Sequence, residues 1–261
     1  MPKLPQRSLQ HEYALYVENE IENYKDSLSR SALLKIGDEA VAALREQQQL
    51  ALTELVVWEE VDRIIKKRLR IPAYSTWRRK RIKLLAEYQR PEHWGFHPNS
   101  VLAREVKLPA SSLVLVVGHD TERAAMYLAA HGCEVFAIDQ TLDTVERVKT
   151  AAEAAGFTDR VHGYITDLRE WAPATLHDEP LSAVVCTPSA FMGLSAGERD
   201  RVIALLQGAT ADGGVHLVNS DGDGDDPRFL EQLSAQYEGW KIMVERAGGV
   251  STSFLARKGA A

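Results

Sequence analysis

The chain has 261 residues, of which 45% are hydrophobic and 26% charged, and its formal net charge is −6. It can bury one large core or two modest ones, but no apolar run approaches the about 18 residues that cross a bilayer. The first residues also lack the apolar region of a signal peptide, so we expect a cytoplasmic protein outside the membrane. Two cysteines, Cys133 and Cys186, are too few for a disulfide framework and lack CxxC spacing, which predicts buried thiols.

Charge is distributed unevenly along the chain. Residues 1–100 hold 17 Lys and Arg against 14 Asp and Glu, a net of +3, whereas the remainder holds 14 against 23, a net of −9. Two domains with different surfaces are indicated. We predict a helical N-terminal domain over residues 1–95, a connector over 96–110 and a second domain over 111–261.

The first ninety residues show helical periodicity. Apolar residues from Tyr13 to Leu28 step by three or four, which predicts an amphipathic helix from His11 onward. After Gly37, the pattern predicts a second, long helix from Glu39 to about Arg70. A third is expected from a Ser75 cap to Tyr88. The apolar face of the long helix needs a partner, which is either the second domain or a second copy in a homodimer.

A basic segment lies within these helices. Residues 63–83 carry ten Lys or Arg and two aromatic residues, Tyr74 and Trp77. Such a cluster is typical of a surface that binds RNA or another polyanion. The alternative is a solvated helix face, or a docking surface for the acidic half or for a second subunit. We favour it because the total charge is −6 and apolar residues interleave with the cations.

After residue 110 the pattern changes to short apolar strands separated by helical intervals. The expected strands are LVLVV, EVFAI, RVHGYI and SAVVC, starting at residues 113, 134, 160 and 182. Strands that alternate with helices imply a parallel sheet covered on both faces. Near the end, WKIMVER and VSTSFLAR predict an antiparallel hairpin. The fold class is therefore α/β, preceded by an all-helical domain.

Polar residues follow the ends of these strands. Gly118 follows the first strand, Asp139 ends the second and Asp167 follows the third. The carboxyl ends of parallel strands open into one crevice, where we expect these residues and Cys186 to Pro188 to converge. Asp139 either accepts both hydroxyls of a ribose or caps the helix that begins near Leu142, and Asp167 is either a ligand or a cap.

Residues 113 to 258 resemble class I S-adenosylmethionine-dependent methyltransferases, and within them the tellurite-resistance and thiopurine branch. The segments that carry the resemblance are VLVVG with Arg123 and YLAAHG behind it, EVFAID ending in Asp139, ITDLREW with Asp167, CTPSAF after the fourth strand, ADGGVHLVNS and YEGWKIMVER. The resemblance implies a Rossmann-like sheet with S-adenosylmethionine as cofactor. It implies that the cofactor is bound by Gly118, His119, Asp120, Arg123, Asp139, Gln140, Asp167, Leu168 and Cys186.

The turn after the first strand departs from the family pattern. It keeps one glycine, and Asp120 and Glu122 stand at the positions of the other glycines. A carboxylate there crowds the methionine part of the cofactor and repels its carboxylate, although it can also meet the ammonium or sulfonium. Either the turn is adapted and the protein is an enzyme, or the domain is a noncatalytic module for assembly or regulation. A nicotinamide dehydrogenase would need glycines at 120 and 123 and is disfavoured.

The methyl acceptor is expected to be a small molecule. CTPSAF lacks the Asn/Asp-Pro-Pro-aromatic run of amino-group base methylation, and Cys186 is not preceded by the proline of cytosine-carbon methylation. Ser189, Phe191 and Asn219 either line the acceptor side or are simple turn residues. Because alignment of acceptor and methyl group is the main task, the pattern identifies no catalytic base.

Other polar segments of the sequence show no complete metal-binding pattern. The acidic run from Asp221 to Pro227 fails the calcium-loop pattern, since Asp226 stands where glycine is needed, and we expect a surface turn. The scattered histidines predict no metal site. The segment HWGFHP, residues 93–98, either folds over the cofactor crevice or fills the seam between domains, and we favour the seam.

Overall fold

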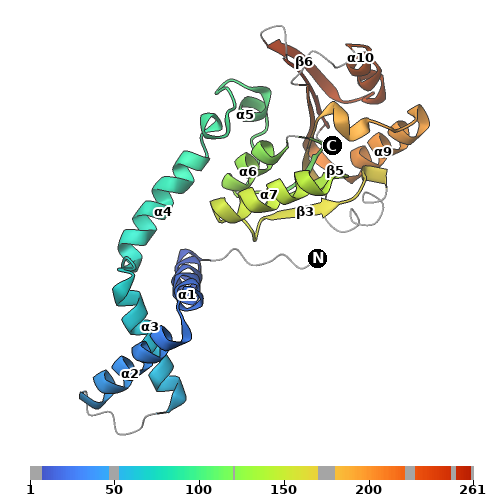
Figure 1. Cartoon of the computed structure of the whole chain (residues 1–261). Coiled ribbons are helices and arrows are strands. Elements are labelled where there is room, and N and C mark those ends of the chain that lie inside the picture. The colour runs from blue at the N-terminus through green and yellow to red at the C-terminus, as the bar shows by residue number, and fades with distance from the viewer. Residues whose placement is uncertain are drawn as a thin grey trace. The chain divides into compact units, whose positions relative to one another are not determined.

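A computed structural model describes residues 8–46, 53–119, 121–169, 180–220, 227–247 and 251–259 (Figure 1). The chain divides into two compact units, Met1–Leu84 and Leu85–Ala261. The predicted domain limits of 1–95, 96–110 and 111–261 stay a prediction. None of the described helices is long and apolar enough to cross a membrane.

The regular structure in the described residues of the first unit is helical. They are α1 (Leu9–Ser27), α2 (Arg30–Glu46), α3 (Glu54–Arg68) and α4 (Tyr74–Tyr88), which runs past the division between the units. Ser8 caps α1, because its hydroxyl accepts a hydrogen bond from His11 N at 3.2 Å. A small core is shared by α1, α2 and α3 and consists of Ile21, Ile36, Ala40, Val61 and Ile65.

The prediction of one long helix from Glu39 to Arg70 is wrong. Gly37 lies inside α2, which ends at Glu46, and α3 begins at Glu54. Thr53 starts the new helix by accepting a hydrogen bond from Val56 N at 3.4 Å. The apolar faces of α2 and α3 pack against each other in one core. The argument for a homodimer from an uncovered long helix therefore loses its basis, and the homodimer stays a prediction.

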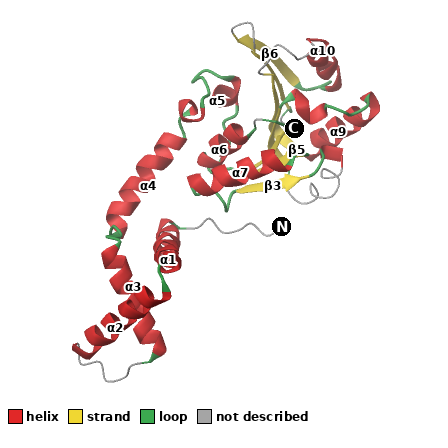
Figure 2. Ribbon diagram, in the orientation of Figure 1, coloured by secondary structure: helices red, strands yellow, loops and turns green. Residues whose placement is uncertain are grey.

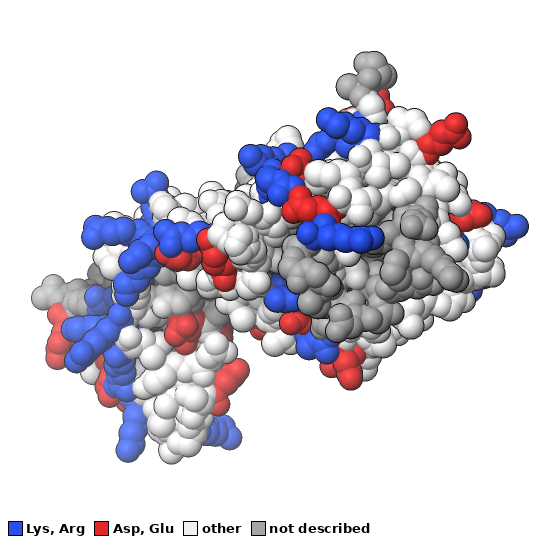
Figure 3. All heavy atoms as spheres, turned by 90° about the horizontal axis from the view of Figure 1, so that it is seen from above, with Lys and Arg blue, Asp and Glu red and all other residues white. Residues whose placement is uncertain are grey.

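The basic segment spans α3 and α4, and Figure 3 shows Lys and Arg side chains exposed over this part of the chain. Three of its cations pair with carboxylates: Arg63 with Glu60, Arg68 with Glu39, and Arg81 with Glu12. Lys67, Arg70, Arg78, Arg79, Lys80 and Lys83 have no ion pair within the described residues. Most of these cations are exposed. The solvated face, the docking surface and the binding of RNA or another polyanion all stay predictions.

The second unit contains one seven-stranded sheet. The strands are β1 (Leu113–Val117), β2 (Glu134–Asp139), β3 (Val161–Ile165), β4 (Leu181–Cys186), β5 (Thr210–Ser220), β6 (Lys241–Ala247) and β7 (Ser251–Arg257). Their order in space is β3-β2-β1-β4-β5-β7-β6. The first five are parallel, whereas β7 pairs antiparallel with both β5 and β6. The predicted α/β class with its terminal antiparallel hairpin is confirmed.

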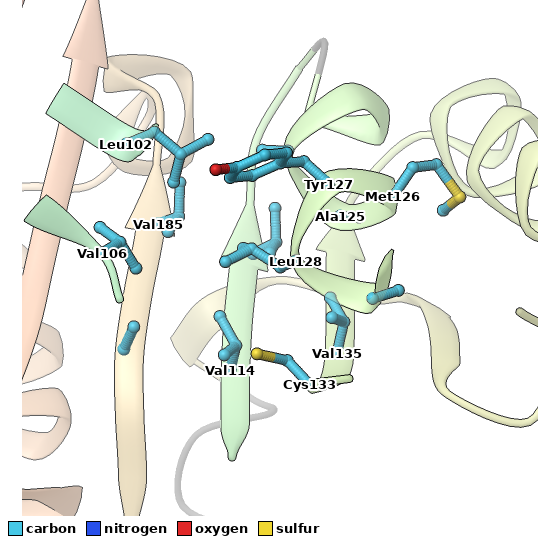
Figure 4. Close-up of a cluster of buried hydrophobic side chains, with 14 of the residues drawn as sticks. Leu102, Val106, Val114, Ala125, Met126, Tyr127, Leu128, Cys133, Val135 and Val185 are labelled. Carbon is cyan, nitrogen blue, oxygen red and sulfur yellow. The ribbon is translucent and has the colours of Figure 1, made fainter. Parts of the chain in front are cut away.

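Helices cover both faces of this sheet (Figure 2). They are α5 (Val101–Glu105), α6 (Glu122–Ala130), α7 (Leu142–Ala155), α9 (Ala196–Ala209) and α10 (Pro227–Gln236), with short 3-10 turns η1 (Pro91–Trp94) and η2 (Pro188–Phe191). The core on the side of α6 and α7 includes Tyr127 and Leu128, and Figure 4 shows Tyr127 extending toward Leu102 of α5. The other core gathers α9, α10 and the opposite side chains of the strands.

The segment before α5 packs within the second unit. Tyr88, Trp94 and Phe96 contact the α6 side of the core, and Trp94 Nε1 donates a hydrogen bond to Tyr88 O at 2.7 Å. Gly95, between Trp94 and Phe96 in the sequence, has φ +76°, a left-handed conformation that favours glycine. This turn brings Phe96 and His97 to the carboxyl-end side of the sheet, where they line a cavity described below.

Candidate functional site

A cavity of about 160 Å³ opens at the carboxyl ends of β1, β2 and β3. Parallel strands place their carboxyl ends at one edge of the sheet, so residues far apart in sequence meet there. The lining includes seven predicted site residues, namely Gly118, His119, Asp139, Gln140, Asp167, Leu168 and Ser189. Val117, Thr141, Thr166, Ala190 and Met192, which the sequence did not single out, complete it.

Gly118 forms the turn that leaves β1. Its φ is +105°, and a Cβ there would overlap Thr187 Oγ1 and lie 2.7 Å from Ser189 Oγ. Ser189 Oγ accepts a hydrogen bond from His119 N at 3.0 Å, and the Thr187 and Ser189 hydroxyls are 2.6 Å apart. Only glycine suits this position, for reasons of both conformation and space. The single retained glycine is therefore the one that this turn requires.

Asp139 is a buried carboxylate at the end of β2, with 6% of its surface exposed. Its Oδ1 accepts hydrogen bonds from Thr141 N at 2.7 Å and Thr141 Oγ1 at 2.5 Å. Its Oδ2 lies 3.3 Å from Nδ1 of His119, whose side chain is 57% exposed. The N-cap of α7 is Thr141 rather than Asp139, so Asp139 holds the cap residue with one oxygen and turns the other to His119.

Asp167 is tied to the chain that follows it. Its Oδ1 accepts from Arg169 N at 2.8 Å, and its Oδ2 accepts from Arg169 Nε and Nη2 at 3.0 and 2.5 Å. Arg169 also donates to Glu198 Oε1 at 3.1 Å. The backbone contact is that of a cap, while the residue also lines the cavity. Ser195, by capping, and then Arg169 lower the pKa of Glu198 to about 2.

Other predicted residues lie outside this cavity. Cys186 is buried in the core on the α9 side, where burial raises the pKa of its thiol to about 12, and Phe191 packs there against Phe229. Arg123 and Asn219 line a second cavity. Asp120 and the acidic run 221–226 lie outside the described residues.

The second cavity has a volume of about 600 Å³ and belongs to the same unit. It is lined by Gly95, Phe96, His97, Asn99, Ser100, Val101, Leu102, Arg104, Arg123, Asn219, Glu245 and Ser253. Most of these were not predicted, because they come from segments that no local motif connects. The composition of HWGFHP gave a partial signal, since a fold over the crevice was one of its two interpretations.

The sequence from residue 90 to 242 matches the family model described as "Tellurite resistance protein TehB". The match covers more than half of the chain. The chain belongs to the TehB family. TehB proteins are a branch of the class I methyltransferases, whose cofactor is S-adenosylmethionine, and the sheet order agrees with the architecture that the resemblance implied.

Comparison with solved structures gives distant similarities. TehB from Haemophilus influenzae is 20% identical, with a TM-score of 0.49, and 62% of each chain is covered, so less than two thirds of that protein is spanned. An O-methyltransferase family protein from Burkholderia thailandensis is 16% identical, with 70% of this chain and 57% of that chain covered and a TM-score of 0.47. A candidate methyltransferase from Streptococcus mutans, solved in complex with SAH, is 15% identical, with 58% and 90% covered and a TM-score of 0.46. Curated protein sequences gave no significant match.

The residues of the first cavity fit the adenosine half of the TehB cofactor. Asp139 offers a buried carboxylate for ribose hydroxyls, and Leu168 and Met192 give apolar surface for a base. The backbone at Gly118 leaves no room for a side chain. A turn whose main chain closely approaches a ligand requires such a glycine. These observations on the chain itself make S-adenosylmethionine a chemically suitable occupant.

Proposed function

We propose that this protein transfers a methyl group from S-adenosylmethionine to a small-molecule acceptor. The observation that carries the proposal is the meeting of Asp139, Gly118 and Leu168 in one cavity at the carboxyl edge of the sheet. When bound, S-adenosylmethionine supplies a methyl group on a positively charged sulfur, ready for in-line displacement. The chain itself then has to hold the cofactor and the acceptor, orient the acceptor toward the methyl group and exclude water from between them. A cytoplasmic location goes with this proposal.

Five residues of the first cavity have definite roles in this proposal. Asp139 accepts the ribose hydroxyls, and Thr141 fixes its carboxylate by occupying Oδ1. Asp167 lies one strand further and accepts from the exocyclic amino group of adenine, while Arg169 holds it in place. Gly118 lets the main chain approach the sugar and methionine, and Ser189 holds the next amide, His119 N.

The acceptor is assigned to the small-molecule class because of the room available. The second cavity, about 600 Å³, lies in the range of about 300–1,000 Å³ that is usual for small ligands. Its lining mixes apolar and polar groups, which is typical of such sites. The alternative of a noncatalytic module differs in one measurable respect, because it does not require the cofactor to bind.

Titration calorimetry with S-adenosylmethionine and S-adenosylhomocysteine tests the proposal. We expect binding in the micromolar range, about −8 kcal/mol. Asp139→Ala should weaken it at least tenfold, since the ribose loses a charged acceptor. The matched control is Asp143→Ala, which removes an exposed acid from the first turn of α7. Absence of heat with either ligand, from folded protein free of copurified cofactor, would contradict the enzyme proposal.

A further inference from the structure

The second cavity contains a guanidinium that is positioned but not neutralised. Arg123, at the start of α6, lies over the ring of Phe96 at 5.6 Å from the ring centroid. Its Nη1 also approaches Gly95 so closely that a Cβ on Gly95 would lie 3.2 Å away. Within the described part of the chain, Arg123 forms no ion pair. Its N–H donors are therefore held in place and open to a ligand.

The other charged groups in and beside this cavity are joined in ion pairs. Arg104 donates to both carboxylate oxygens of Glu245, at 3.4 and 2.6 Å, and its Nε donates to Glu105 at 2.9 Å. These contacts lower the pKa of Glu245, so this carboxylate is ionised at neutral pH. Arg123 then remains as the unpaired charge among the described lining residues. A guanidinium without an ion pair in a cavity wall indicates an anionic ligand.

The remaining walls define the rest of that ligand. Phe96, Val101 and Leu102 provide apolar surface beside the cation. At the end of β5, Asn219 Oδ1 accepts a hydrogen bond from Ser253 Oγ at 2.8 Å. Asn219 lines the cavity, so its NH₂ group adds hydrogen-bond donors to the wall. An apolar body carrying one acidic group matches this set of neighbours.

We propose that the second cavity binds the methyl acceptor, and that the acceptor is a small organic carboxylate whose carboxylate group is held by Arg123. A guanidinium pairs with a carboxylate through two parallel hydrogen bonds, which fixes orientation as well as charge. Phe96 and Gly95 hold the Arg123 guanidinium in one position before the ligand arrives. This preorganisation reduces the side-chain entropy that is lost when the carboxylate binds. The role as acceptor site rests on the proposed methyltransferase function, whereas carboxylate binding itself does not.

The same chemistry has a second source, because the methionine part of the cofactor also carries a carboxylate. The test therefore titrates acceptor and cofactor separately. Benzoate, phenylacetate and 3-phenylpropanoate are titrated into protein saturated with S-adenosylhomocysteine, each beside its neutral amide. We expect at least one carboxylate to bind tenfold or more tightly than its amide.

Variants then assign this preference to Arg123. Arg123→Gln should abolish the preference for carboxylate over amide. The family resemblance assigned Arg123 to the cofactor, but the proposal assigns it to the second cavity, so the affinity for S-adenosylhomocysteine should change by less than threefold. Phe96→Leu, which removes the ring beneath the guanidinium, should weaken carboxylate binding by about threefold to tenfold, as loss of a cation–π contact predicts. Arg201→Gln, on an exposed position of α9, is the matched control and should leave both affinities unchanged.

Three results would overturn the inference. They are equal binding of every carboxylate and its amide, a carboxylate preference that survives Arg123→Gln, and loss of S-adenosylhomocysteine binding in Arg123→Gln, which would assign the cation to the cofactor. If the unaltered protein fails to bind S-adenosylhomocysteine, the methyltransferase proposal fails. Titration of the carboxylates without it then still decides whether the cavity binds them.

Discussion

Asp139 Oδ2 lies 3.3 Å from Nδ1 of His119, on the side of the carboxylate that Thr141 leaves open. This is the oxygen that a ribose hydroxyl has to reach if the proposed function is right. His119 is half-exposed and follows the glycine turn directly, so it can leave Asp139 when a ligand enters. The contact therefore competes with the cofactor for this oxygen.

The first prediction concerns this competition between His119 and the cofactor. Contacts between partly exposed groups of this kind are worth about 0.2–1 kcal/mol. His119→Ala frees Asp139 Oδ2, so the variant should bind S-adenosylhomocysteine up to about fivefold more tightly than the unaltered protein, as measured by calorimetry at pH 7. Weaker binding by the variant would contradict the competition.

The second prediction concerns the glycine turn. Gly118→Ala should cost about 1–3 kcal/mol in stability because of its left-handed backbone, and should further displace Thr187 and Ser189. We expect S-adenosylhomocysteine binding to weaken at least tenfold. Gly193→Ala is the control, since φ there is +79° but nothing lies within 4 Å of the added Cβ. If both variants bind S-adenosylhomocysteine as tightly as the unaltered protein, crowding at Gly118 has no effect on cofactor binding and the prediction is wrong.

The α/β fold could be predicted because its information is local. Residues 113–117 form β1 as expected, and the terminal hairpin agrees to within one residue at either end. Each strand is a short apolar run bounded by polar residues. The gathering of Gly118, Asp139 and Asp167 follows from the rule for parallel strands, which needs only their order.

The remainder depended on contacts that no local pattern carries. Arg104 and Glu245 are 141 positions apart, and their pairing arises only once α5 lies beside the terminal hairpin. Cys186 ends a strand, yet its side chain points into the apolar core rather than the crevice. The prediction of one long helix fails because the spacing of apolar residues continues through Thr53, where a side-chain cap starts a new helix.

The third prediction concerns the independence of the two units. Ile65 is fully buried among α1, α2 and α3, so Ile65→Ala should destabilise this small core by about 2–5 kcal/mol. Hydrogen exchange followed by mass spectrometry should show faster exchange in α2 and α3. Exchange in the sheet and the affinity for S-adenosylhomocysteine should not change. The control is Ile82→Ala, at a position that is 43% exposed. Faster exchange of the β1 or β4 amides in Ile65→Ala would contradict separate folding of the two units.

The fourth prediction concerns a buried histidine on β5. His216 is 1% exposed, and its two ring nitrogens lie 2.7 Å from Thr210 Oγ1 and Tyr237 Oη. Thr210 Oγ1 already donates to Leu206 O at 2.6 Å, so it accepts from Nε2–H of the ring. Nδ1 is then the acceptor for the Tyr237 hydroxyl. A neutral imidazole satisfies every partner, whereas a protonated one has a second donor facing Tyr237.

Burial, with a smaller effect of Lys258, lowers the pKa of His216 to about 3. In the unfolded chain a histidine titrates at about pH 6.5. Below this pH the unfolded state therefore binds a proton that the folded state does not bind. Stability is therefore unaffected above pH 6.5 and falls by about 1.4 kcal/mol per pH unit toward pH 3. Hydrogen exchange of β5, corrected for intrinsic rates, should report a loss of about 2 kcal/mol between pH 6.5 and 5.0. His216→Gln should be less stable at pH 7 but should not show this loss of stability between pH 6.5 and 5.0. Parallel pH profiles for the two proteins would contradict the assignment of the loss to His216.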